Sequence, residues 1–180
     1  FAVVDLEPQI FDKNDAIVLE EEIEVVEFKD VYFTYPNTNI AVLSGISFKA
    51  EGGEFLGIMG HTGAGKTTIL KLLMRYYTPD SGDVLINGVS IEDYTLDSVR
   101  DKIGFVSQEP FLFYGSIKDN VIYNQTANDD ELQIALELAG AAEFIQELEE
   151  GLETMVGDRG AMLSGGQRAR VSLARALLKQ

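Results

Sequence analysis

The residues best suited to chemistry lie in one glycine-rich segment, 60–68, which reads GHTGAGKTT. Its glycines and Lys66-Thr67 have the spacing of a phosphate-binding loop. Glycine lets backbone N–H groups converge on phosphate oxygens where a Cβ would obstruct them, and a following helix start adds partial positive charge. We expect Lys66 to contact the β- and γ-phosphates and the Thr67 hydroxyl to ligate Mg²⁺. The alternative is a glycine-rich turn with an unrelated lysine, and the flanking pattern disfavours it.

The whole loop is predicted to bind a nucleoside triphosphate. His61 is the only histidine of the chain, and we expect it to lend its backbone rather than to bind metal or act as a base. The predicted binding residues of this loop are Gly60, His61, Thr62, Gly63, Ala64, Gly65, Lys66, Thr67 and Thr68.

Such a loop needs a strand before it and a helix after it. The apolar run Glu54–Met59 suits a buried parallel strand, and residues 66–77 have helical spacing closed by Pro79. Alternation from Ile23 to Phe33, interrupted near Lys29-Asp30, predicts a pair of strands. Further segments read as strands at 42–50, 84–86 and 103–107, and as helices around 132–148 and 164–179. Because strands and helices alternate, the pattern favours an α/β fold with a parallel sheet.

Composition narrows the class of protein. The 180 residues hold 30 Asp+Glu against 14 Lys+Arg, a net charge of −16, which argues against a nucleic-acid-coating surface. The absence of cysteine excludes disulfides and thiolate-bound metals. No apolar run approaches the roughly 18 residues of a membrane span, so this stretch is predicted to be soluble. Acidic residues dominate the segments 1–30 and 129–158, whereas the charged residues of 159–180 are all basic. A polyanionic ligand would therefore be attracted to the segment 159–180.

A second glycine-flanked helix start lies in that basic stretch. Residues 163–167 read LSGGQ, and Ser164 is a good N-cap ahead of two glycines. An ordinary capped helix would have this sequence too, but it would not explain two phosphate-type helix starts about a hundred residues apart, because one nucleotide needs only one.

With both motifs, the sequence resembles the nucleotide-binding domain of ATP-binding cassette (ABC) transporters over nearly its whole length. LSGGQ is similar to the signature motif of that family, in which two domains pair head to tail. The resemblance implies that Ser164, Gly165, Gly166 and Gln167 contact ATP held by the opposite subunit.

Two more positions match the family. Tyr35, in VYFTYP, looks like the aromatic residue that stacks on adenine, although a strand-end aromatic can also pack on the core. Gln108, in FVSQEPFLF, looks like the glutamine that touches Mg²⁺ and the attacking water. ATP and Mg²⁺ are the implied cofactors, with Thr67 and Gln108 as the implied metal contacts.

The stretches 112–121 and 154–160 are similar to the exporter branch. This implies a transmembrane domain earlier on the same chain, residues 1–22 as an acidic linker, and a location at the cytoplasmic face of the cell membrane. The implied fold is a P-loop ATPase core with an antiparallel β subdomain (about 23–56, returning at 83–90) and a helical subdomain (about 112–163), all within a nucleotide-binding domain at 23–180.

The resemblance stops at Gln180, before the family's Walker B strand, catalytic glutamate and switch histidine. We therefore expect a longer chain, and we expect residues 1–180 alone to bind nucleotide weakly and not to hydrolyse it. The Walker B strand lies beside the P-loop strand in the family, so its neighbours would otherwise have unpaired edges.

The predicted function is ATP binding and hydrolysis that drives a membrane exporter, with a second nucleotide-binding domain as partner and no nucleic acid. Two alternatives stay open: a soluble ABC-type ATPase acting on DNA or ribosomes, and a non-hydrolysing module that binds ATP only to dimerise. The transported substrate and the choice between homodimer and heterodimer are not encoded here.

Overall fold

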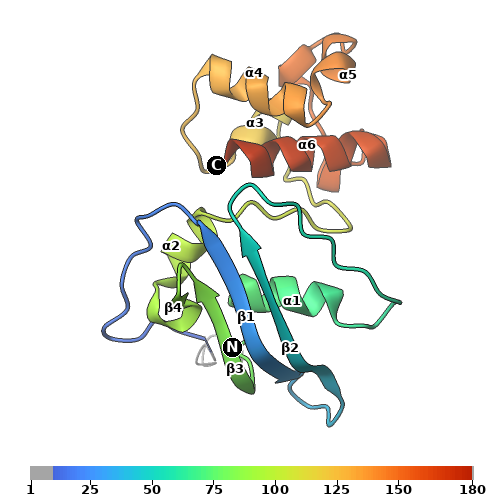
Figure 1. Ribbon diagram of the computed structural model, residues 1–180. Coiled ribbons are helices and arrows are strands. Elements are labelled where there is room, and N and C mark those ends of the chain that lie inside the picture. Colours follow the sequence, from blue (N-terminus) through green and yellow to red (C-terminus); the bar gives the residue numbers. More distant parts are fainter. Residues whose placement is uncertain (1–9, 180) are drawn as a thin grey trace, which may run out of the picture. The chain divides into compact units, whose positions relative to one another are not determined.

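The computed structural model describes residues 10–179, and the chain divides after Lys102 into two compact units (Figure 1). The first nine residues of the predicted linker, and Gln180, lie outside the described part.

An antiparallel sheet forms the centre of the first unit. Its strands are β1 (Val25–Thr34), β2 (Ala41–Glu51), β3 (Ser81–Ile86) and β4 (Val89–Ser90), in the order β2-β1-β3-β4 (Figure 1). The predicted antiparallel pairing is confirmed, and Asn87 and Gly88, both with positive φ, form the turn that joins β3 to β4.

The interruption expected near Lys29-Asp30 is a bulge inside one strand, so the prediction of two separate strands there is wrong. Asp30 has φ 46°, and the register with β2 shifts between Phe28 and Val31. The bulge restores the inward alternation, because Phe28 and Val31 are both buried although three positions apart.

Helices α1 (Lys66–Leu73) and α2 (Leu96–Asp101) and the 3₁₀ turn Ile91–Asp93 complete the first unit. The expected helix to Tyr77 ends early at Leu73. Arg75 adopts the left-handed conformation (φ 49°), and its buried guanidinium donates to the backbone oxygen of Tyr94. This conformation turns the chain out of the helix.

The described part of the predicted linker, residues 10–22, packs on the first unit. Ile17 bridges to Tyr94, Asp12 accepts a hydrogen bond from the Leu96 N–H (2.8 Å), and the Leu19 side chain is buried. Sequence alone indicated only an aperiodic acidic stretch.

Two expected strands, one just before the phosphate loop and one just before Gln108, do not form. Glu54–Met59 and 103–107 have no strand assignment, and Phe55 and Met59 are 107% and 95% exposed. Within residues 10–179 the sheet is antiparallel, and parallel pairing is limited to the Ile17–Tyr94 bridge. Apolar composition alone does not make a strand, because a strand needs a hydrogen-bonded neighbour, and no described segment supplies one.

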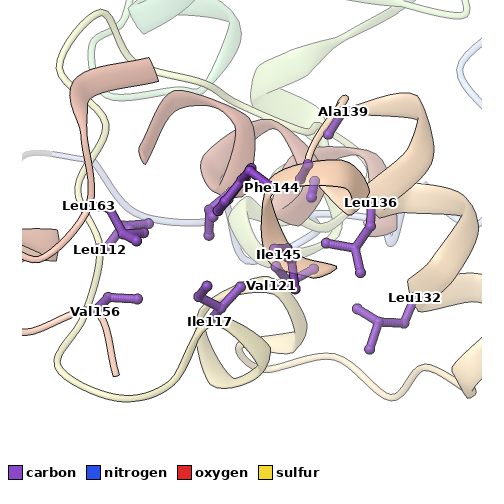
Figure 2. Packing of buried hydrophobic residues seen from close by; sticks show 13 residues of the cluster. Leu112, Ile117, Val121, Leu132, Leu136, Ala139, Phe144, Ile145, Val156 and Leu163 are labelled. Atoms are coloured by element: carbon purple, nitrogen blue, oxygen red, sulfur yellow. The ribbon is translucent and has the colours of Figure 1, made fainter. Parts of the chain in front are cut away.

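The second unit is helical: α3 (Ile117–Ile122), α4 (Asp129–Leu138), α5 (Ala142–Gln146) and α6 (Gly165–Leu178), with 3₁₀ turns at Gly151–Glu153 and Asp158–Gly160. Helix α6 packs against α3 and α4 (Figure 1). The hydrophobic core of the second unit, seen in Figure 2, consists of Leu112, Ile117, Val121, Leu132, Leu136, Ala139, Ala141, Phe144, Ile145, Val156, Leu163, Val171 and Ala174.

The predicted helix at 164–179 is confirmed, but Leu173, an apolar residue of this helix, is not in the core. Leu173 is 37% exposed, whereas Ser172 beside it is 6% exposed. The buried face is centred on Val171 and Ala174, and the 100° step per residue turns Leu173 away from it.

Candidate nucleotide-binding site

Helix α1 begins without a side-chain cap. Its N-cap is Gly65 (φ 87°), and its first turn holds no acidic residue. The first helical acceptor is the Gly65 carbonyl, which binds the N–H groups of Thr68 and Ile69 at 3.0 and 3.1 Å. The N–H groups of Lys66 and Thr67 therefore have no acceptor within the helix. The helix start presents donors and partial positive charge, with nothing of its own to neutralise them.

A side chain would clash at Gly65 of the loop and would be tight at Gly60. A Cβ on Gly65 would lie 2.7 Å from Leu43 Cδ2, in a left-handed conformation that L-residues rarely adopt. A Cβ on Gly60 would lie 3.1 Å from the Ala64 Cβ. The backbone of the loop, residues 60–68, called the cradle below, therefore passes close to neighbouring atoms at these two glycines.

Lys66 lies inside this cradle. Its Nζ donates to the backbone oxygens of Gly60 and His61, both at 2.8 Å. An ammonium carries three donors, so one remains after these two bonds. His61 contributes its backbone oxygen, as expected. The amides and the ammonium together have the donor chemistry that a triphosphate requires.

Two neighbouring threonines have different environments. Thr67 is exposed at the helix start, whereas Thr68 is 3% exposed and its hydroxyl forms a 2.9 Å hydrogen bond with the Tyr35 hydroxyl. Of the pair, Thr67 has the accessible hydroxyl oxygen, which is the ligand type that Mg²⁺ accepts.

Tyr35 follows β1 and packs edge-on against Phe33 and Tyr77, with ring centroids 5.0 and 5.1 Å away. The structure thus joins it to α1 through Thr68 and to the core through the two rings. The contact of Tyr77 with Tyr35 was not predicted, because the sequence pattern extends the helix to Tyr77.

The start of α6 contrasts with that of α1, because it caps itself. The Ser164 hydroxyl accepts from the Gln167 N–H at 3.2 Å, and the Gln167 side-chain oxygen accepts from the Ser164 N–H at 2.8 Å. This is a capping box. Ser164, Gly165 and Gly166 are exposed, so their outer surface is open to a ligand.

Arg168 braces the loop ahead of α6. Its guanidinium donates to the backbone oxygen of Leu163 at 2.7 Å and to that of Gly160 at 3.4 Å. The signature segment therefore has a fixed backbone within the second unit.

Gln108 is exposed in the second unit, in a turn where the Ser107 hydroxyl donates to the Glu109 backbone oxygen (2.6 Å). Thr67 belongs to the first unit. That Thr67 and Gln108 bind the same Mg²⁺ stays a prediction.

Arg175 of α6 organises the second unit and was missed by sequence reasoning. Its Nε and Nη2 donate to the backbone and side-chain oxygens of Asn120 (2.6 and 2.8 Å), and Nη1 donates to the Phe111 oxygen (3.1 Å). The guanidinium also lies over the rings of Phe113 and Tyr123. Burial lowers the pKa of Arg175 from its ordinary value. These contacts fix α6, the helix whose N-cap is Ser164.

Comparison with known proteins identifies the class. The family profile described as ABC transporter matches residues 43–180, and the chain belongs to this family. Membership implies that the domain binds ATP. The predicted α/β fold, a P-loop ABC-ATPase domain with an antiparallel sheet and a helical part, is confirmed by this match and by a solved structure.

That structure is a bacterial Atm1-family ABC exporter with ATP bound. It matches with a TM-score of 0.93 and 37% identity, over 100% of this chain and 32% of the other. ABC transporter B family member 21 of Arabidopsis thaliana is 40% identical over 99% of this chain and 14% of its own length. The ATP-dependent lipid A-core flippase of Vibrio vulnificus is 42% identical over 99% of this chain and 31% of its own length.

The chain thus spans about a third or less of these relatives. Within residues 10–179, no helix has both the length and the apolar character that crossing a bilayer requires.

Proposed function

We propose that this chain is the ATP-binding domain of an ABC exporter, in which ATP hydrolysis drives transport across a membrane. The observation that carries the proposal is the uncapped start of α1, where Lys66 and free backbone amides converge. Names of the similar proteins support the exporter branch, since they include an Atm1-family exporter and a lipid A-core flippase.

The residues of the first unit divide the binding between them. The amides of the loop and Lys66 hold the phosphates, with Lys66 exchanging backbone carbonyls for phosphate oxygens. The Thr67 hydroxyl binds Mg²⁺, and the Tyr35 ring stacks on the base. Bound MgATP supplies the γ-phosphoryl group that water attacks. In the second unit, the exposed Gln108 amide offers both a donor and an acceptor with which to orient that water.

The start of α6 serves a second copy of the domain. Its own N–H groups are already partly satisfied by the Ser164–Gln167 box, so it is suited to adding hydroxyl and glycine contacts to a nucleotide held elsewhere. We therefore place Ser164, Gly165, Gly166 and Gln167 against the ATP of a head-to-tail partner. The transmembrane domain belongs to the same chain, and this domain lies at the cytoplasmic face of the membrane.

The test is binding and turnover of ATP by the full chain. Lys66→Ala is expected to weaken ATP binding by about 10- to 100-fold, the value of one or two charge-assisted hydrogen bonds. Lys118→Ala on α3 is the control and should bind as the wild type does. Equal affinity of Lys66→Ala and wild type would contradict the proposal. Tight binding without phosphate release would instead support the dimerisation module.

A further inference from the structure

Lys71 is a cation of the first unit that holds no carboxylate. It lies on α1, five residues after Lys66, and among residues 10–179 it takes part in no ion pair. Its Nζ lies 5.2 Å from the ring centroid of Tyr35 and 5.9 Å from that of Tyr77. The ammonium therefore lies near two aromatic rings and beside no acid of the described part.

The same ammonium reaches the hydroxyl of Tyr35. Lys71 Nζ donates to that oxygen at 3.4 Å, and the hydroxyl also bonds to Thr68 at 2.9 Å. Both partners are residues of α1. The tyrosine is thus attached at its polar end to the helix whose first residues form the phosphate cradle.

This attachment sets the position of the ring relative to the cradle. The edge contacts with Phe33 and Tyr77 fix the body of the ring, at interplanar angles of 81° and 88°. Lys71 and Thr68 fix its hydroxyl. A ring held on all these sides keeps one orientation in the free protein, which lowers the entropic cost of stacking a base on it.

We propose that Lys71 is a positioning residue of the nucleotide site, which acts through Tyr35 to strengthen binding of the base and not of the phosphates. The proposal rests on the proposed function, because it assumes that Tyr35 faces the base of ATP. It assigns to α1 two tasks, which are phosphate binding at its first turn and base positioning at its second.

The experiment compares two ligands of the full chain, ATP and inorganic tripolyphosphate, by competition with labelled ATP. Lys71→Met keeps the apolar stem and removes the charge. We expect it to weaken ATP binding by about three- to tenfold, as loss of a cation–π contact and a hydrogen bond would. Tripolyphosphate binding should change by less than about twofold, because the Lys66 cradle is intact.

Three further variants separate positioning from other roles. Lys71→Arg, which keeps a cation over the rings, should restore most of the ATP affinity. Tyr35→Phe, which keeps the ring but loses both hydroxyl contacts, should weaken ATP and spare tripolyphosphate. In a Tyr35→Ala background, Lys71→Met should have no further effect, since the two residues act as one unit.

Each opposite result overturns the proposal. Equal weakening of ATP and tripolyphosphate would make Lys71 a phosphate ligand. Unchanged ATP affinity in Lys71→Met, or full additivity with Tyr35→Ala, would remove the positioning role. Failure of the proposed function is distinguishable, because it would appear as an absence of ATP binding by the wild type, or as indifference of both ligands to Lys66→Ala.

Discussion

Helices α1 and α6 both begin after glycine-containing loops, and they begin differently. Helix α1 starts at an uncapped Gly65, whereas α6 starts at Ser164, whose side chain forms a box with Gln167. Among α1, α4 and α6, the helices of eight or more residues in the described part, only α1 has no side-chain cap. An open helix start reserves its amides for a ligand, and a self-capped start is stable without one.

The contrast explains why one domain carries two phosphate-type motifs. The cradle at α1 has donors suited to a triphosphate, which are backbone N–H groups without a helical acceptor and the half-buried Lys66 ammonium, together with the exposed Thr67. At the start of α6 the box occupies the side-chain oxygens of Ser164 and Gln167 as acceptors, so the Ser164 hydroxyl and the Gln167 amide can still donate to a ligand at the surface. We infer that it completes a site rather than making one.

Replacing a glycine by alanine at each of the two helix starts is expected to give the largest difference in stability between the two units. Gly65→Ala forces a left-handed alanine against Leu43 and should destabilise the first unit by about 3 kcal/mol. At Gly165 no atom comes within 3.9 Å of a Cβ and φ is not positive, so Gly165→Ala should change stability by less than about 0.5 kcal/mol. Hydrogen exchange of α1 and α6 amides in the full chain measures both. Equal effects would remove the distinction.

Removing the Arg175 side chain from α6 is expected to give the next largest loss of stability. Arg175→Met leaves oxygens of Asn120 and Phe111 without their donor and should cost about 1–3 kcal/mol in the second unit. Exchange protection of α3 and α6 should fall, while protection of α1 stays as in the wild type. If α1 lost protection equally, the two starts would not be independent.

Removing the cap of α6 should separate stability from function. Ser164→Ala and Ser116→Ala each delete the hydroxyl of a capping box, at α6 and α3 respectively, and each should cost about 1 kcal/mol. Only Ser164→Ala is expected to impair ATP-dependent association of two domains, which light scattering of the full chain would detect. An equal loss of association in Ser116→Ala would show that α6 has no special role.

The smallest expected effect is a change in stability at acidic pH. Hydrogen bonds from Ser116 lower the pKa of the exposed Asp119 carboxylate below its ordinary value of 3.8. The folded state therefore gains stability that is present above that value and is lost as pH falls through the lowered pKa. Because the group is exposed, we expect about 0.5 kcal/mol or less.

The box at α6 has neutral Gln167 in the corresponding place, so its cap should not titrate in this range. The difference in stability between Asp119→Asn and the wild type should become smaller as the pH drops below 3.8. A difference that stays constant with pH would contradict the assignment. Urea unfolding at a series of pH values provides the measurement.

Local patterns predicted both helix starts well, because loop, cap and first turn are consecutive in sequence. They failed at Glu54–Met59 and 103–107, where strand formation depends on a neighbour and not on composition. They also missed the contacts of Lys71 with Tyr35 and of Arg175 with Asn120, whose partners are 36 and 55 positions apart. Such pairs follow from tertiary packing, which no window of the sequence contains.

The most direct test mixes two defective full-length chains, one with Lys66→Ala and one with Ser164→Ala. Each alone should hydrolyse ATP poorly. If the start of α6 serves the partner's nucleotide, the mixed dimer contains one intact pairing of Lys66 with Ser164, and mixing should restore activity. If both motifs served the same nucleotide, every site in the mixture would be defective and no activity would return, which would contradict the account.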